Sequence, residues 1–230
     1  MSTKKVLGKS SEKLSEKKVL IVGLGGTGCS VANLLARLKI NLILVDDDIV
    51  DNTNLERQIL YYDSDLLKSK TESSKEKLSE FANIISINER LSENNISKII
   101  PTDIDLVIDC TDNIETRLLI NKYCRKNKID WIYTGAVHSI GAIYFIDNKS
   151  EESNRKACFE CMNGNKDGET SCEIGVLNSL VVIVASFASN LAVSYLSGRK
   201  IEDKMLRINL NDNSINKISV KKNHSCIVCN

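Results

Sequence analysis

The chain has 230 residues, of which 42% are hydrophobic, enough to bury one substantial α/β core. Its 31 lysines and arginines oppose 30 aspartates and glutamates, and the formal net charge of +1 excludes a global attraction to nucleic acid or to an anionic membrane. The first 18 residues are polar and contain six lysines, so we expect no secretory signal and a cytoplasmic location.

The first elements form a strand, helix, strand unit. Residues 19–22 are an apolar, β-branched run that ends at the glycine-rich turn 23–28. Apolar side chains then recur at helical spacing from Val31 to Leu38, and residues 41–45 form a second apolar run. This order is typical of a dinucleotide-binding unit, so we expect a nucleotide phosphate at the N-terminus of the helix.

The rest of the chain predicts the other half of an α/β fold. Strands are expected at residues 84–87, 105–109, 129–134, 141–146, 206–210 and 215–220, and helices at 116–126 and 179–196. Ser186, Ser189 and Asn190 interrupt the last helix, and a bilayer span needs roughly 20 mostly apolar residues, so a buried core helix is expected. The polar stretch 149–171 is typical of a mobile loop. We predict a Rossmann-like, mainly parallel sheet extended by antiparallel strands.

Charged residues beyond the glycine turn indicate which nucleotide binds. Asp46 ends the second strand, where a carboxylate can accept both ribose hydroxyl groups. Arg57, in the run Asn54-Leu55-Glu56-Arg57-Gln58, supplies a cation where a triphosphate needs one. We therefore interpret the chain as one that uses ATP chemically. NAD binding and a tight turn without a ligand are the alternatives.

Each glycine of the turn has an expected role. Gly23 allows the tight turn, Gly25 or Gly26 lets the backbone approach phosphate, and Gly28 lets the helix pack on the strand.

Several ordered motifs resemble the ThiF/MoeB/HesA family, the bacterial relatives of ubiquitin-activating enzymes. They are Gly23-Leu24-Gly25-Gly26-Thr27-Gly28, Asp46-Asp47-Asp48, Asn54-Leu55-Glu56-Arg57-Gln58, Lys70, and Asp109-Cys110-Thr111-Asp112-Asn113 with Arg117. The resemblance covers residues 17–229 and implies site residues. Asp46 would hold the ribose, with Asp48 in the same cofactor-binding set. Arg57 and Lys70 would neutralise the triphosphate, Asp112 would hold Mg²⁺, and Asn54 and Gln58 would complete the pocket.

The same resemblance implies an activity and partners. Such enzymes adenylate the C-terminal carboxylate of a small ubiquitin-like sulfur-carrier protein of the ThiS or MoaD type and release pyrophosphate, in thiamine or molybdopterin biosynthesis. A homodimer is expected, and a cysteine desulfurase is one possible sulfur donor. Two alternatives stay open: adenylation of another carboxylate, such as a modified tRNA nucleoside or a peptide, and a non-catalytic nucleotide-binding adaptor.

The residue content suits this reaction. An α-carboxylate has a pKa of roughly 3.3 to 3.7 and is already anionic at neutral pH, so no general base is needed. Only two histidines occur, and neither is required. What the reaction needs is positioning and cation screening, which Arg57, Lys70 and a magnesium ion on Asp112 would supply.

Four of the eight cysteines form two Cys-x-x-Cys pairs, Cys158 with Cys161 and Cys226 with Cys229. This pair of pairs predicts a closed tetrahedral zinc site that ties the C-terminus to the long loop. A redox dithiol and incidental thiols are the alternatives. A single domain is expected over residues 1–230, with a polar N-terminal segment (1–18), a nucleotide-binding half (19–146) and a zinc and carrier-binding half (147–230).

Two features depart from the family. The family cysteine that forms a thioester or persulfide lies four residues before a Gly-Val pair, whereas Cys172 lies three residues before Gly175. Cys172 is therefore both a catalytic candidate and, in the alternative, an ordinary loop thiol. Close relatives also carry an N-terminal arginine that reaches the partner subunit's ATP site. No arginine precedes Arg37 here, and Lys13, Lys17 or Lys18 is the candidate replacement.

Overall fold

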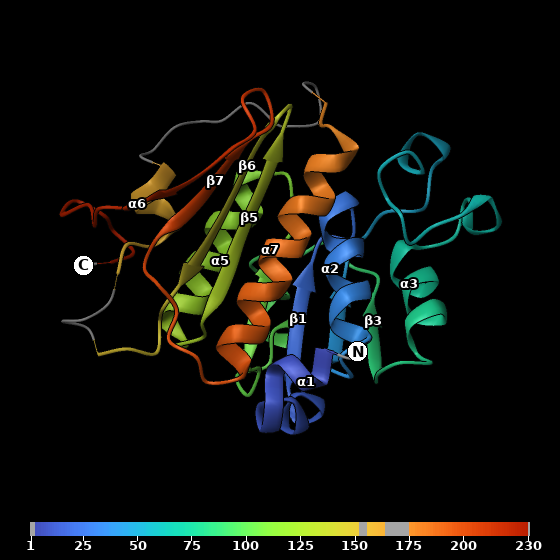
Figure 1. Cartoon of the computed structure of the whole chain (residues 1–230), viewed down its shortest axis with the longest axis horizontal. Helices are drawn as coiled ribbons and strands as arrows, with labels where there is room; N and C mark the ends of the chain where they lie inside the picture. The colour runs from blue at the N-terminus through green and yellow to red at the C-terminus, as the bar shows by residue number, and fades with distance from the viewer. Residues whose placement is uncertain (1–2, 152–155, 164–174, 230) are drawn as a thin grey trace.

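A computed structural model describes residues 3–151, 156–163 and 175–229. Within these residues one sheet of eight strands has the order β3-β2-β1-β4-β5-β6-β7-β8 (Figure 1). The strands are β1 (Lys18–Val22), β2 (Asn41–Val45), β3 (Ile84–Ile87), β4 (Leu106–Asp109), β5 (Trp131–Val137), β6 (Ile140–Ile146), β7 (Met205–Asn209) and β8 (Ser214–Ile218). The pairs from β3 to β5 are parallel, and those from β5 to β8 are antiparallel. The predicted fold class is confirmed.

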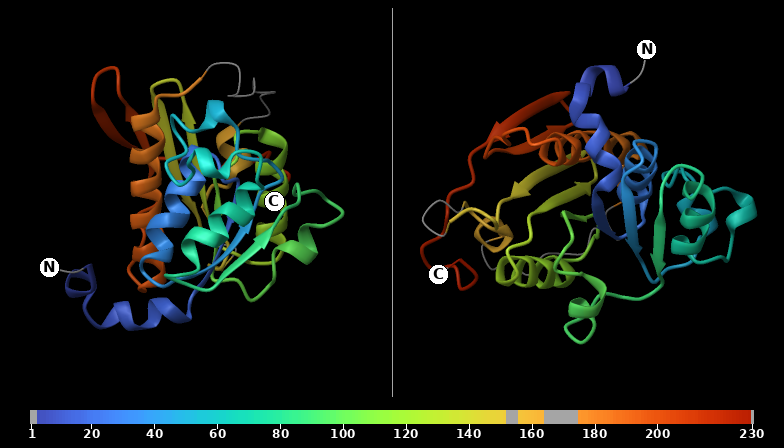
Figure 2. Two further views of the ribbon diagram at one scale, coloured as in Figure 1. Left: turned by 90° about the vertical axis from the view of Figure 1, so that its right-hand side faces the viewer. Right: turned by 90° about the horizontal axis from the view of Figure 1, so that it is seen from below.

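Helices cover both faces of the sheet. They are α1 (Thr3–Leu7), α2 (Gly26–Ala36), α3 (Lys70–Leu78), α4 (Ile96–Ile99), α5 (Ile114–Lys126), α6 (Phe159–Asn163) and α7 (Asn178–Leu196), with the 3-10 turns η1 (Gly8–Glu16), η2 (Asn52–Asn54) and η3 (Asp63–Asp65). In Figure 2, α2 and α7 lie side by side on one face, and α5 lies on the other. Helix α6 packs against α5.

Strand β1 shows why the central strands read as unbroken apolar runs. Val19 and Ile21 belong to the core between the sheet and the α2 and α7 helices. Leu20 and Val22 belong to the second core, which contains Ile120 of α5. Both faces of a parallel strand are buried in this arrangement, so its sequence shows no alternation of apolar and polar residues.

Helix α7 is a core helix, as the sequence predicts. Within the described part of the chain it is the one helix long and apolar enough to cross a membrane by length and composition, and half of its apolar window is buried. Leu180, Val184 and Ala188 have no exposed surface and pack in the core shared with α2. Its apolar character is therefore explained by burial in the protein.

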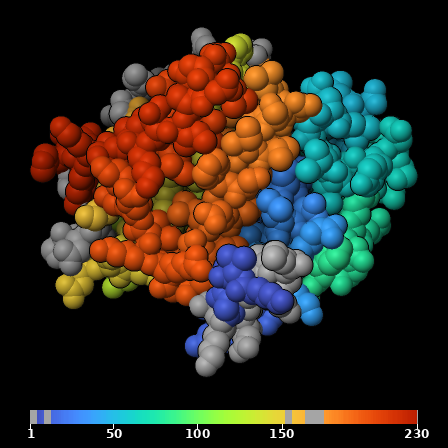
Figure 3. All heavy atoms as spheres, in the orientation of Figure 1, coloured from blue at the N-terminus to red at the C-terminus, as the bar shows by residue number. Residues whose placement is uncertain are grey.

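Several helical segments were not expected from the sequence, among them α1, α3, α4 and α6. Helix α3 contains one apolar residue, Leu78, yet Thr71 and Ser74 are also buried on its inner face. Helix α6 lies inside the stretch 149–171 that the sequence predicts to be a loop, and part of that stretch is outside the described residues. The N-terminal segment forms α1 and η1, and Leu14 of η1 lies in the core. Figure 3 shows this segment at the lower edge of the molecule, near the end of α7.

Candidate active site and metal centre

The glycine turn joins β1 to α2 by very close backbone contacts. Gly23 has φ +86°, and a Cβ at this position would lie 2.8 Å from the carbonyl oxygen of Cys110. A Cβ at Gly28 would lie 1.8 Å from the carbonyl oxygen of Gly23, so the packing role expected for Gly28 has a direct steric basis. Gly25 is the N-cap of α2 and has open space around it. The first amide groups of α2 therefore have room for an anion.

A cavity of about 640 Å³ opens at the carboxyl ends of the parallel strands, beside this turn. It brings together nearly all the residues expected to bind the nucleotide: Gly23, Gly25, Gly26, Asp46, Asp48, Asn54, Arg57, Gln58, Lys70 and Asp112 line it. Gly28 does not line it. The volume lies within the range of ordinary small-molecule sites.

Asp46 joins the two loops that flank the cavity. Its Oδ2 accepts a hydrogen bond from the Leu24 amide at 2.6 Å, and its Oδ1 accepts one from the Asp48 amide at 2.8 Å. Burial raises the pKa of Asp46, and the nearby charge of Lys70 opposes that rise. The carboxylate thus fixes the glycine turn against the end of β2, and each oxygen keeps a further lone pair for a ligand.

The two expected phosphate cations differ in burial. The Lys70 side chain is 6% exposed and its Nζ lies 2.8 Å from Oδ2 of Asp48, whose side chain is 67% exposed. Arg57 is 30% exposed, and its Nη1 donates to the carbonyl oxygen of Thr53 at 3.0 Å and to Oε1 of Glu56 at 3.1 Å. Both cations are held by partners at the cavity wall, so they are oriented before a ligand arrives.

Gln58 carries an unpaired acceptor at the cavity wall. The residue is 3% exposed, and its Oε1 has no hydrogen-bond partner within the described residues. A buried acceptor without a partner is costly unless a ligand or a water supplies the donor. Among the residues around the cavity this atom fits a bound polar ligand, because a nucleotide amino or hydroxyl group can donate to it.

Asp112 lies in the segment between β4 and α5. The N-cap of α5 is the next residue, Asn113, whose Oδ1 accepts from the Thr116 amide at 2.8 Å. Asp112 itself is exposed and lines the cavity. An exposed carboxylate at the carboxyl end of a parallel strand suits Mg²⁺, which prefers oxygen ligands and keeps several waters.

Arg117 and Asp109 form a largely buried ion pair; both belong to the motifs found in the sequence, which gave them no role in the site. Asp109 has no exposed surface, and its Oδ1 accepts from the Thr111 amide at 3.0 Å and from Thr111 Oγ1 at 2.6 Å. Arg117 Nε lies 3.5 Å from the Asp109 Oδ2, and Nη2 donates to the Thr134 carbonyl oxygen at 3.3 Å. Burial raises the pKa of Asp109, and Arg117 opposes that rise. The pair fixes the segment that leads to Asp112.

Tyr61 is a second residue that sequence reasoning missed. Its hydroxyl lies 3.1 Å from the Leu24 carbonyl oxygen and 3.0 Å from Ser74 Oγ. It therefore connects the glycine turn to α3, the helix that begins with Lys70. A buried tyrosine hydroxyl needs such partners, but nothing in the sequence indicates where they lie.

The four paired cysteines meet on the α5 side of the sheet. Cys158 Sγ lies 3.9 Å from Cys161 Sγ and 3.6 Å from Cys226 Sγ, and Cys161 Sγ lies 3.6 Å from Cys229 Sγ. A tetrahedron with Zn–S bonds of about 2.3 Å has edges of about 3.8 Å, so the four sulfurs fit a tetrahedral metal. The spacing is also far longer than a disulfide bond of about 2.0 Å.

Outer groups donate hydrogen bonds to three of these sulfurs. Asn121 Nδ2 lies 3.5 Å from Cys158 Sγ, the Asn223 amide lies 3.3 Å from Cys161 Sγ, and Arg125 Nη2 lies 3.0 Å from Cys229 Sγ. Hydrogen bonds from Cys158 and Arg125 lower the pKa of the Cys229 thiol. Thiolate ligands are stabilised by such donors.

Some expected site residues do not join either centre. Cys172 lies outside the described residues, which resume at Gly175, a residue that lines the cavity. Lys17 and Lys18 form ion pairs with Asp105 and Asp103 at 2.8 Å. Those aspartates precede β4, at the amino ends of the parallel strands, whereas the cavity lies at their carboxyl ends, so neither lysine lines the cavity of its own chain.

Comparisons with known proteins agree with this geometry. The model of the ThiF family matches residues 2–228. A molybdopterin-synthase adenylyltransferase of Haemophilus influenzae is 34% identical over 219 residues, covering 92% of this chain and 88% of that protein. The sulfur carrier protein ThiS adenylyltransferase of Escherichia coli is 30% identical over 227 residues, covering 95% and 88%.

Among solved structures, E. coli MccB with ATP has a TM-score of 0.82 at 23% identity, covering 98% of this chain and 69% of that one, which shows a shared fold. The relatives confirm the expected enzyme class, an adenylyltransferase. The chain belongs to the ThiF family.

Proposed function

We propose that this protein uses ATP and Mg²⁺ to adenylate the C-terminal carboxylate of a small ubiquitin-like sulfur-carrier protein, releasing pyrophosphate. The observation that carries the proposal is the cavity itself, where Arg57, Lys70 and the unpaired Oε1 of Gln58 surround open space at the N-terminus of α2. Two relatives are named as adenylyltransferases of molybdopterin synthase and of the sulfur carrier protein ThiS. These names support a sulfur-carrier protein as the class of substrate.

The residues of the chain would act by orientation and charge. The substrate carboxylate is ionised at neutral pH, so the difficulty is the approach of one anion to another. Arg57 and Lys70 would offset the phosphate charge, while the α2 amides and Asp46 would hold the phosphates and the ribose. Asp112 would hold Mg²⁺, which screens the phosphate oxygens when it is bound. Asp109 and Arg117 would keep the Asp112 segment in place.

We also propose that Cys158, Cys161, Cys226 and Cys229 hold a structural Zn²⁺. The support is the near-tetrahedral spacing of the sulfurs and the donors on them. A closed site with four thiolates has no open position for a substrate, so its role is to stabilise the fold. It would fasten the C-terminal turns to α6, and through α6 to α5.

The proposal extends to the oligomeric state, the sulfur-transfer residue, the sulfur donor and the location of the protein. We propose a homodimer, as the family resemblance implies, and its candidate contact region is the connection from β2 to α3, where Ile59, Tyr62 and Leu67 are 50%, 63% and 80% exposed. Light scattering of the purified protein measures its oligomeric state. Cys172 stays a candidate sulfur-transfer residue, a cysteine desulfurase a candidate donor, and the cytoplasm the proposed location.

The test is carrier-dependent exchange between ATP and pyrophosphate. The full chain is incubated with labelled pyrophosphate, ATP and Mg²⁺, and with a ThiS-type or a MoaD-type carrier. The matched control is the same carrier with one residue added after its terminal Gly-Gly, which displaces the carboxylate. Exchange with the native carrier and none with the extended one supports the proposal. Exchange that ignores the carrier overturns the substrate assignment.

A further inference from the structure

We infer that Arg125 is the counter-cation of the metal centre: its buried guanidinium offsets the charge of the zinc tetrathiolate and thereby raises the affinity for zinc. The inference rests on the proposed zinc site. It goes beyond that site, because neither the spacing of the cysteines nor the expected zinc ligands involve a residue of α5.

Arg125 is buried among neutral acceptors. The residue is 8% exposed and lies in the last turn of α5. Its Nη1 donates to Asn148 Oδ1 at 2.9 Å and to the Asp147 carbonyl oxygen at 3.3 Å. Its Nη2 donates to the Lys156 carbonyl oxygen at 3.2 Å and to Cys229 Sγ at 3.0 Å. The sulfur is thus the one acceptor of the four that carries a full charge when it binds a metal.

No carboxylate compensates this cation within the described residues, whose ion pairs all involve other side chains. Asp130 and Asp147, one close to Arg125 in sequence and the other in contact with it through its carbonyl oxygen, use their carboxylates for other partners. Asp130 accepts from the Asn148 amide at 2.7 Å and from the Tyr195 hydroxyl at 2.6 Å. Asp147 accepts from the Ser150 amide at 2.9 Å. An unpaired buried guanidinium is strongly unfavourable, so an anion is required beside it.

The metal centre supplies that anion. Four thiolates around one Zn²⁺ carry a net charge of about −2, and this charge is also mostly buried. Placing a guanidinium against one of the sulfurs offsets both buried charges at once, and a charged donor makes a stronger hydrogen bond than a neutral one. Asn121, which contacts Cys158, is neutral and can orient its sulfur but cannot offset the charge.

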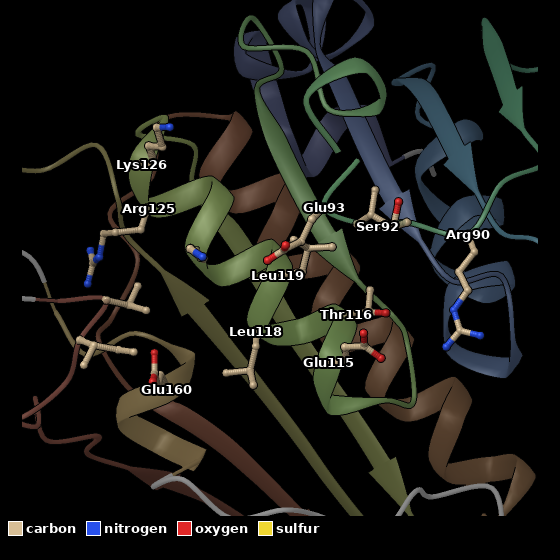
Figure 4. Close-up of a pocket in the computed structure, with 14 residues that line it drawn as sticks. Arg90, Ser92, Glu93, Glu115, Thr116, Leu118, Leu119, Arg125, Lys126 and Glu160 are labelled. Atoms are coloured by element: carbon tan, nitrogen blue, oxygen red, sulfur yellow. The ribbon is translucent and has the colours of Figure 1, made fainter. Parts of the chain in front are cut away.

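The neighbouring Lys126 offers a matched control. It is the next residue of the same helix and carries the same charge, but it is exposed. Both residues line a groove of about 750 Å³ along the outer face of α5. Figure 4 shows the Arg125 and Lys126 side chains pointing in different directions from the last turn of α5. A substitution of Lys126 therefore removes one positive charge from α5 without touching the metal centre.

The first experiment measures zinc affinity in the full-length chain by competition with a chromogenic chelator. Arg125→Met is expected to weaken zinc binding by about 10- to 100-fold, the usual effect of losing an outer partner of a metal ligand. Arg125→Lys, which keeps the charge, is expected to lose less than Arg125→Met, and Lys126→Met is expected to match the wild type. Equal affinity in Arg125→Met and Lys126→Met overturns the inference, as does equal loss in Arg125→Lys and Arg125→Met.

The second experiment separates a charge role from a packing role, and it also covers a poorly stable variant. The melting temperatures of the wild type and Arg125→Met are measured with saturating zinc and again with excess chelator. Arg125→Met is expected to lower the melting temperature of the zinc-loaded protein but to spare or raise that of the zinc-free protein, where the cation has lost its anion. An equal decrease in both states means that Arg125 only packs, and overturns the inference.

The measurements distinguish failure of the proposed zinc site from failure of the proposed role of Arg125. A wild-type chain that is purified without zinc and takes up none overturns the zinc site and the role of Arg125 together. Zinc that binds equally well to every variant overturns only the role of Arg125. Exchange between ATP and pyrophosphate is a separate measurement and is not used to decide either point.

Discussion

The cavity and the cysteine cluster show two opposite ways of arranging polar groups. Around the cavity, Gln58 has a buried oxygen without a partner, and Asp48 and Asp112 are largely exposed. In the cluster, the sulfurs lie within 3.9 Å of a neighbour, and Asn121 and Arg125 donate to them from buried positions. A site that binds and releases ligands keeps unused hydrogen-bonding capacity, whereas a structural site is closed around its ion.

If the two sites are independent, removing one group from the cavity should abolish catalysis without changing the cysteine cluster. Asp112→Ala is expected to lower carrier-dependent exchange by about 100-fold or more, because it removes the proposed magnesium ligand, while zinc content is unchanged. Glu115→Ala removes a nearby exposed carboxylate that does not line the cavity, and is expected to keep near-normal exchange. Normal exchange in Asp112→Ala contradicts the magnesium role.

The complementary experiment removes one of the four proposed zinc ligands from the cysteine cluster. Cys226→Ser is expected to lose zinc and at least about 3 kcal/mol of stability, because the metal's binding free energy contributes to folding. Thermal unfolding and metal analysis measure both effects. Ser225→Ala changes the adjacent residue, whose amide is bound by Asn223 Oδ1, and should retain zinc and stability. If Cys226→Ser keeps a full zinc complement, the tetrathiolate site is wrong.

Substitution of Gln58 tests whether a group that favours ligand binding in the cavity lowers the stability of the free protein. Gln58→Met removes the buried oxygen that has no partner, so the melting temperature is expected to stay the same or rise. The KM for ATP is expected to rise about 10-fold, because the ligand loses an acceptor. An unchanged or higher melting temperature together with a higher KM for ATP would show that the unpaired oxygen serves ligand binding and not the stability of the fold. A fall in stability with an unchanged KM would show that the oxygen serves the fold alone.

Tyr61 should give the smallest effect. Tyr61→Phe keeps the ring but removes the hydroxyl between the glycine turn and α3, and the KM for ATP is expected to rise about 3- to 10-fold, the equivalent of one hydrogen bond. Because Tyr61 acts by positioning, kcat should change less than KM. Tyr62→Phe, at the exposed neighbouring position, is the control. A kcat loss that exceeds the KM change argues against a positioning role.

Much of the fold follows from local sequence. The observed bounds of the strands at 41–45 and 84–87 match the prediction, because short β-branched apolar runs are a strong local signal for a strand. Helix α3 was missed because Lys70 to Leu78 is polar and its buried face consists mainly of serine and threonine. Periodicity of apolar residues cannot reveal a helix whose inner face is polar.

The site residues likewise fall into those that the sequence predicts and those that it does not. Spacing alone predicts that the cysteine pairs converge, and ordered motifs predict the cavity residues that line one wall. Arg125 and Tyr61 could not be predicted, because their roles depend on contacts with residues distant in the sequence, Cys229 and Leu24. An arginine near the end of a helix is normally a solvated residue that favours the helix dipole, and only tertiary structure shows it to be buried.

Helix α5 physically links the two centres. Its N-cap, Asn113, lines the cavity, and Arg125 in its last turn contacts the cysteine cluster. Thirteen residues make a rod of about 20 Å, and a rod transmits a tilt at one end to the other. We therefore predict that loss of the proposed zinc disturbs the opposite end of α5, next to Asp112, so that removing zinc with a chelator lowers the exchange activity at temperatures where the protein is still folded.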